Sequence, residues 1–148
     1  MADVILITTP DDMIETACNE MAVRGVFGPE NYVFHTSGAL STSVLETARA
    51  KGAKVGCIHP MHAFATVDGA IEDLPGSVFG VTADEEALPL ARQIAIDLGG
   101  EPITIRDEEL KDEVKHIHYK HCAALSFHFA LYISRLTGFF TFHRTSSF

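Results

Sequence analysis

The chain has 148 residues, 47% of them hydrophobic, which suits one folded domain with a sizeable core. Its formal net charge is −9 and it has no long basic run, which argues against nucleic-acid binding because that depends on phosphate neutralisation by Lys and Arg. The sequence shows no signal peptide, no apolar run near the ~20 residues of a membrane helix, and three scattered cysteines, so we expect a cytoplasmic protein with reduced thiols.

The first predicted strand is the apolar run 4–7. It lacks the alternation of a half-exposed strand, which indicates a parallel sheet covered by helices on both faces. Pro10 ends the strand, and Asp11 or Asp12 is suited to cap the helix that follows, with Asp12 and Glu15 spaced as in a capping box. The inward side chains of this helix are expected to share one face: Met13, Ala17 and Met21, with Ile14 beside them.

The alternation of strand and helix then continues. Further strands are predicted at 32–34, 54–58, 78–81 and 103–105. One helix is expected to start at Ser41 or Ser43, and a second, capped by Asp84, to present apolar residues at helical spacing: Leu88, Ala91, Ala95 and Leu98. This order predicts an α/β fold with a partial doubly wound parallel sheet of the Rossmann type.

The chain changes character after this region. We expect residues 1–108 to form the C-terminal part of a Rossmann-like NAD(P)-binding domain, and residues 109–148 to start a helical dimerisation or substrate domain. The stretch 122–136 is apolar on most of a helical circumference, so it needs cover from a partner subunit or a further domain. A homo-oligomer is therefore expected, with the helical domain incomplete.

The sequence lacks a glycine-rich phosphate loop. None of its 11 glycines has the G-x-G-x-x-G spacing that normally follows the first strand of a dinucleotide-binding fold. We interpret the chain as the back half of a nucleotide-dependent oxidoreductase, truncated at both ends. Alone, it is expected to bind NADPH poorly and to be inactive, because backbone N–H groups at a helix N-terminus normally hold the pyrophosphate.

Three segments are expected at the ligand-binding edge of the sheet: 9–11, 35–38 and 59–64. Each follows a predicted strand, and ligands bind beyond the carboxyl ends of the strands in open α/β sheets. Simpler structural explanations exist for two of them. The Thr-Pro-Asp sequence at 9–11 is more often a helix cap, and His59 could be only a turn residue held extended by Pro60.

These segments resemble successive strand exits of a known family. The runs 5–12, 35–41 and 56–64, in this order and at these intervals, are similar to a family of Rossmann-like oxidoreductases with a C-terminal helical domain of unknown function. That family belongs to the superfamily of prephenate dehydrogenase, pyrroline-5-carboxylate reductase and deazaflavin-dependent NADP reductase. The resemblance extends to about residue 136.

The resemblance implies a cofactor role for two strand exits, with NADP as the cofactor. The residues that would contact its ribose and nicotinamide end are Thr9, Pro10 and Asp11 after the first strand, and Thr36, Ser37 and Gly38 after the second.

The resemblance also implies a catalytic residue. His59 matches the His of the His-Pro-Met motif of prephenate dehydrogenases, and an imidazole suits hydride transfer because the reaction also moves a proton near neutral pH. His62 and His121 are expected to contact a small-molecule substrate. The alternative is a module without a cofactor that binds a ligand or itself.

A metal site is not expected. On a helix His118, His121 and His128 lie near one face, but no carboxylate has the spacing of a metalloenzyme helix. Cys57 lies inside an apolar strand and is expected to be a core residue.

Overall fold

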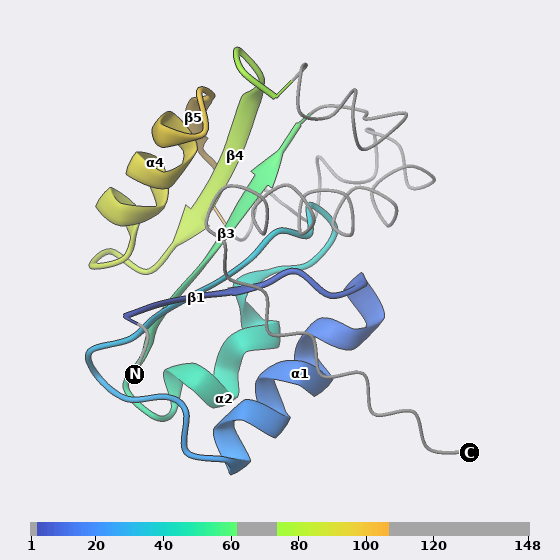
Figure 1. Cartoon of the computed structure of the whole chain (residues 1–148), viewed down its shortest axis with the longest axis vertical. Helices are drawn as coiled ribbons and strands as arrows, with labels where there is room; N and C mark the ends of the chain where they lie inside the picture. The colour runs from blue at the N-terminus through green and yellow to red at the C-terminus, as the bar shows by residue number, and fades with distance from the viewer. Residues whose placement is uncertain (1–2, 62–73, 107–148) are drawn as a thin grey trace.

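The computed structural model describes residues 3–61 and 74–106 (Figure 1). The strands are β1 (Val4–Ile7), β2 (Tyr32–His35), β3 (Lys54–Pro60), β4 (Val78–Ala83) and β5 (Glu101–Thr104). The helices are α1 (Asp11–Val23), α2 (Glu46–Arg49), which follows the 3₁₀ turn η1 (Thr42–Leu45), and α4 (Leu88–Asp97). In the described residues no helix is long and apolar enough to cross a membrane.

The five strands form one sheet in the order β1-β2-β3-β4-β5. β1, β2 and β3 are parallel, with Ile7 opposite His35 and His35 opposite Cys57. β4 runs antiparallel to β3, and β5 is parallel to β4. The expected parallel-dominated sheet is confirmed, but the direction of β4 was not foreseen, because an apolar strand has the same sequence pattern in either direction. β4 and β5 therefore end at the opposite edge of the sheet from β1–β3.

Helices cover both faces of the sheet, α1 and α2 on one face and α4 on the other (Figure 1). Successive residues of β2 point to opposite faces: Val33 packs in the core under α1 and α2, and Phe34 packs in the core under α4. Both side chains are fully buried, which stabilises the fold by about 1.5–3 kcal/mol per large apolar side chain. The unbroken apolar runs in the sequence follow from this two-sided burial.

The first helix differs from its prediction at the start and on its buried face. Pro10 is the N-cap residue, and not Asp11 or Asp12. Both carboxylates instead lie in the first turn, where they interact favourably with the helix dipole. Ile14 is buried, and Ala17 and Met21 pack against the same core, as predicted. Met13 is 46% exposed, and Cys18 is buried in its place, so the centre of the buried face differs from the predicted one.

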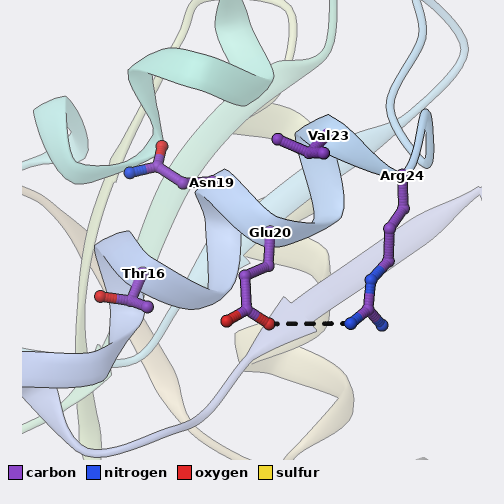
Figure 2. Close-up of a pocket in the computed structure, with 5 residues that line it drawn as sticks. All are labelled: Thr16, Asn19, Glu20, Val23 and Arg24. Carbon is purple, nitrogen blue, oxygen red and sulfur yellow. Dashed lines mark ion pairs between the residues drawn. The ribbon is translucent and has the colours of Figure 1, made fainter.

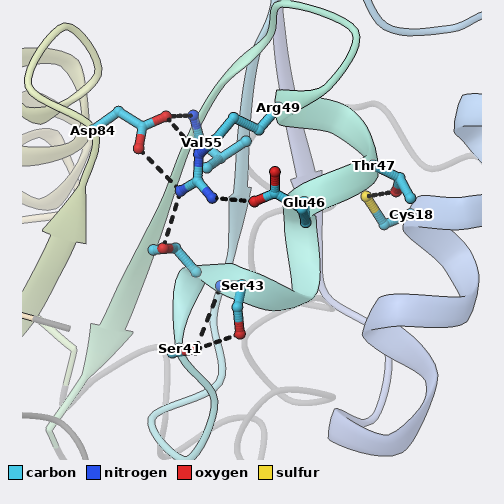
Figure 3. Close-up of polar contacts among 9 residues, drawn as sticks. Cys18, Ser41, Ser43, Glu46, Thr47, Arg49, Val55 and Asp84 are labelled. Atoms are coloured by element: carbon cyan, nitrogen blue, oxygen red, sulfur yellow. Dashed lines mark hydrogen bonds and ion pairs between the residues drawn. The ribbon is translucent and has the colours of Figure 1, made fainter. Parts of the chain in front are cut away.

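Asp84 does not cap α4, contrary to the sequence prediction. α4 begins after Ala87 without a side-chain cap. The Asp84 carboxylate accepts the Val55 N–H (3.0 Å) and pairs with the Arg49 guanidinium (3.0 Å), as Figure 3 shows. Arg49 also pairs with Glu46 (2.6 Å). This ion-pair network ties the end of β4 to β3 and α2, a long-range use of a carboxylate that a local capping pattern does not reveal.

Other sequence expectations hold. Ser41 caps η1 by accepting the Ser43 N–H (Figure 3), as predicted for the start of that helical segment. Cys57 is buried, and within the described residues neither Cys57 nor Cys18 forms a disulfide bond.

Candidate functional site

The candidate site lies where β1, β2 and β3 end. Because these three strands are parallel and in register, β1 ends at Ile7 and β2 at His35 at the same edge of the sheet, and β3 continues past Cys57 to end there at Pro60. His59 is the last but one residue of β3 and faces the same side of the sheet as Cys57. β1 ends at Ile7 directly opposite His35 of β2, so the exit of β1 also lies at this end of the sheet. The structure thus brings the exits of β1, β2 and β3 together, as the topology predicts.

The His59 ring is oriented by the backbone of the segment after β2. Its Nδ1 atom lies 3.3 Å from the carbonyl oxygen of Thr36. A carbonyl oxygen only accepts hydrogen bonds, so Nδ1 must carry the proton and donate it. In the neutral ring the other nitrogen, Nε2, then has the lone pair that can accept a proton.

Gly38 lies directly against this ring. A Cβ atom at Gly38 would lie 2.2 Å from Nε2 of His59 and 2.4 Å from its Cδ2, far inside van der Waals contact. The φ of Gly38 is not in the left-handed region, so the requirement for glycine arises from the close approach of His59. The close approach of His59 explains why residue 38 is a glycine. The sequence alone predicted Gly38 only as a cofactor contact.

Replacing Gly38 with alanine is expected to expel the His59 ring while the fold survives, since a side-chain ring can rotate away. The lost hydrogen bond to Thr36 corresponds to a destabilisation of about 1 kcal/mol. Urea unfolding of Gly38→Ala, His59→Ala and the double variant would measure the coupling between the two sites. If the loss of unfolding free energy in the double variant equalled the sum of the two single losses, the contact between Gly38 and His59 would be contradicted.

The pKa of His59 is lowered. Burial of the ring lowers it below the ordinary value of 6.5, while the hydrogen bond to Thr36 and the charge of Asp11 act in the opposite direction. Burial has the largest effect because removing an imidazolium from water disfavours the charged form. The ring is therefore neutral at neutral pH and suited to accept a proton.

This shift predicts a pH dependence of stability. Below about pH 6.5 the unfolded chain binds a proton at His59 before the folded chain does, so stability falls as pH falls and levels off below the folded pKa. Between about pH 7.5 and about pH 5, the free energy of unfolding measured in urea should fall less for His59→Gln than for wild type. All other histidines are common to both proteins. Equal losses would show that His59 titrates normally.

Two hydroxyl groups at this edge have no partner in the described part of the chain. They are Oγ1 of Thr9, after β1, and Oγ1 of Thr36, after β2, and both atoms are buried. The Thr36 side chain as a whole is 2% exposed. A buried hydroxyl without a hydrogen bond is costly, so these two atoms are suited to contact polar groups of a ligand.

Hydrogen bonds fix the segment after β2. The Sγ atom of Cys57 donates to the carbonyl oxygen of Ser37 (3.1 Å), and the Ala39 N–H donates to Oγ of Ser37 (3.2 Å). The Ser37 N–H donates to Nδ1 of His35 (3.2 Å). From the sequence, His35 was expected in a segment at the ligand-binding edge, without its contact to Ser37, and Cys57 was expected only in the core. Their register, which puts both on one face of adjacent strands, is the signal that could have found them.

The predicted substrate contacts His62 and His121 lie outside the described residues, as do His118 and His128, which were considered as metal ligands together with His121. Within the described ranges, no group of three His, Cys, Asp or Glu side chains could hold a metal ion.

Two hollows lie away from the candidate site. A pocket of about 410 Å³ follows the outer side of α1 and is lined by Thr16, Asn19, Glu20, Val23 and Arg24 (Figure 2). It contains an exposed Glu20–Arg24 ion pair at 3.9 Å, a kind of contact that contributes little to stability. A second, of about 240 Å³, lies beside the ends of β4 and β5 and includes the Arg49–Asp84 pair. Neither contains His59.

Comparison with known proteins gives structural relatives but no sequence family. No protein-family model matches the chain, and no curated protein matches it significantly. Among solved structures, protein TM1727 from Thermotoga maritima is 26% identical (TM-score 0.58), with 93% of this chain and 51% of that chain covered. Prephenate dehydrogenase from Aquifex aeolicus is 14% identical (TM-score 0.57), with 83% and 52% covered. This chain shares a Rossmann-like fold with these structures.

A third similar structure contains a cofactor. An imine reductase from Aspergillus terreus, solved in complex with NADPH4, is 16% identical (TM-score 0.52), with 91% of this chain and 44% of that chain covered. The chain thus spans about half the length of the structures that it matches. These structures confirm the Rossmann-like fold that the resemblance implied.

Proposed function

We propose that this chain forms part of an NADP-dependent oxidoreductase that acts on a small molecule. The observation that carries the proposal is the neutral His59 ring at the edge where β1–β3 end, with Nδ1 bonded to the Thr36 carbonyl. The likeness to oxidoreductases of the same fold, one of them holding NADPH4, supports the choice of cofactor.

His59 would move the proton that accompanies hydride transfer. In the oxidation of an alcohol, the hydroxyl proton passes to Nε2 as the carbon–hydrogen bond breaks and its electron pair leaves as hydride. In the reverse direction the imidazolium returns the proton to the oxygen or nitrogen of the reduced substrate. A general acid or base of this kind contributes roughly 10²- to 10⁴-fold to the rate.

The described residues fit the nicotinamide end of such a cofactor. The buried hydroxyls of Thr9 and Thr36 need hydrogen-bond partners, which ribose and carboxamide groups offer. NADP would supply the hydride acceptor, and NADPH the donor. The pyrophosphate of such a cofactor is normally held by a glycine-rich loop, which this sequence does not contain. We therefore expect NADPH to bind this chain weakly.

The proposal can be tested on the chain as it stands, by NMR titration with NADPH up to about 1 mM, a range that detects weak binding. Amide signals of Thr9, Thr36–Gly38 and His59 should move, and nicotinamide mononucleotide should move the same signals. Adenosine monophosphate, which lacks the nicotinamide, is the matched control and should leave these signals unchanged. Replacing Thr36 with valine, which has nearly the same shape, should weaken the response.

The outcomes separate the candidate functions. No response at the strand exits would contradict the proposal. Shifts confined to the α1 pocket would favour a binding module without a cofactor. Affinity in the micromolar range or tighter would show that the phosphate loop is dispensable and would refute the expected weak binding. The expected self-association remains a prediction, to be checked by light scattering.

A further inference from the structure

One peptide group connects two histidines at the candidate site. The N–H of Ser37 donates to Nδ1 of His35 at 3.2 Å, and the carbonyl of Thr36 accepts from Nδ1 of His59 at 3.3 Å. The carbonyl of Thr36 and the N–H of Ser37 belong to the same peptide bond. It is trans, as the described chain has no cis peptide bonds, so its N–H and C=O point in opposite directions from a rigid plane.

The two rings must hold their protons differently. His35 accepts a hydrogen bond at Nδ1, so this ring is neutral and has its proton on Nε2. His59 donates from Nδ1, so its neutral form has the proton there. His35 is fully buried at the end of β2, between Ile7 and Cys57 in the register of the sheet. Its position is therefore fixed by the sheet itself.

We propose that His35 is a positioning residue for His59. By holding the Ser37 N–H, the buried His35 ring fixes the plane of the Thr36–Ser37 peptide and so aims the Thr36 carbonyl at Nδ1 of His59. That carbonyl selects the His59 tautomer whose Nε2 accepts protons. The hydrogen bonds at the two ends of the peptide also polarise each other, so His35 supports positive charge on His59.

The functional importance of this role rests on the proposed function of His59, but the structural inference can be measured without cofactor or substrate. Nitrogen-15 NMR of the imidazole rings distinguishes the two neutral tautomers. In the wild-type chain at about pH 7.5, where an ordinary histidine is neutral, we expect an Nε2–H signature for His35 and an Nδ1–H signature for His59. A reversed tautomer or a charged ring at His35 would overturn the inference.

Variants of His35 then test its effect on His59. His35→Asn keeps an acceptor close to the position of Nδ1, and His35→Leu removes it. In the leucine variant the His59 nitrogens should move toward a mixture of tautomers, and the His59 titration midpoint should fall by a few tenths of a pH unit, as expected from lost polarisation. The asparagine variant should retain the wild-type signature.

Cys57→Ala is the matched control, because it removes a buried hydrogen bond to the next carbonyl, that of Ser37, while leaving the shared peptide group untouched. It should leave the His59 tautomer unchanged. A His35→Leu protein that unfolds cooperatively and keeps the wild-type His59 spectrum would reduce His35 to a packing residue. If the leucine variant does not fold, the wild-type tautomers and the asparagine variant still decide the question. If NADPH did not bind, the proposed function would be contradicted, but the result on the tautomers of His35 and His59 would stand.

Discussion

Replacing His59 with asparagine is expected to reduce turnover by roughly 10²- to 10⁴-fold, the usual contribution of a general acid or base. The asparagine amide can still donate to the Thr36 carbonyl, so the fold and cofactor binding should be retained. The effect should therefore fall on kcat, with little change in KM. The acidic limb of the pH–rate profile, which reports protonation of the base, should disappear with the imidazole.

The measurement needs a complete cofactor site. One suitable assembly joins this chain to the part of the Thermotoga maritima protein that has no counterpart here. Substrates would be sought among alcohols, ketones and imines by the change in NADPH absorbance. Arg24→Gln, which alters an exposed ion pair on α1, is the control and should match the unmodified chimera. If His59→Asn turned over within about tenfold of that chimera, proton transfer by His59 would have to be abandoned.

Replacing Gly56 with alanine is expected to destabilise the fold by about 3 kcal/mol, near the upper end of typical overpacking losses. A Cβ at Gly56 would lie 2.7 Å from Cβ of Ala83 and 2.9 Å from the carbonyl oxygen of Thr82. Both atoms are held by the pairing of β3 with β4, so they cannot move away without disturbing the sheet. This loss should exceed that of Gly38→Ala, whose neighbour is a rotatable ring.

Denaturant unfolding measures this loss as a lower midpoint at an unchanged slope. Gly28→Ala is the matched control, because the nearest described atom would be Oδ1 of Asn31 at an ordinary 3.7 Å. Its stability should stay within about 0.5 kcal/mol of wild type. A loss below about 1 kcal/mol for Gly56→Ala would mean that β3 and β4 can separate to admit a methyl group.

The sequence predicted the strands well because their apolar runs reflect burial on both faces, as for Val33 and Phe34. It also placed His59 at the edge shared with Ser37, since parallel strands bring their exits together. Capping patterns were less reliable. In the sequence Asp84 looks like a helix cap, but its carboxylate pairs with Arg49 and accepts the Val55 N–H. A carboxylate can make its strongest contacts with residues that are distant in the sequence, and a local pattern does not show them.

The direction of β4 could not be read from its residues, and neither could the role of His35. An imidazole at the end of a strand has no local pattern that distinguishes a ligand contact from a buried acceptor. Whether His35 is one or the other depends on the orientation of the Thr36–Ser37 peptide group. The catalytic and cofactor assignments of the site residues remain predictions that rest on resemblance and on geometry.

The antiparallel β4 also has a practical consequence for labelling the protein. Since β4 runs antiparallel to β3, a fluorescent probe attached at Glu85, just after β4, would lie at the end of the sheet where β3 begins, away from His59. Glu85 is exposed. Such a probe could follow the folding of the domain during ligand titrations without blocking the edge where the ligand is proposed to bind. In a sheet whose strands were all parallel, every strand would end at the edge where the ligand is proposed to bind, and no strand end would be free for a probe.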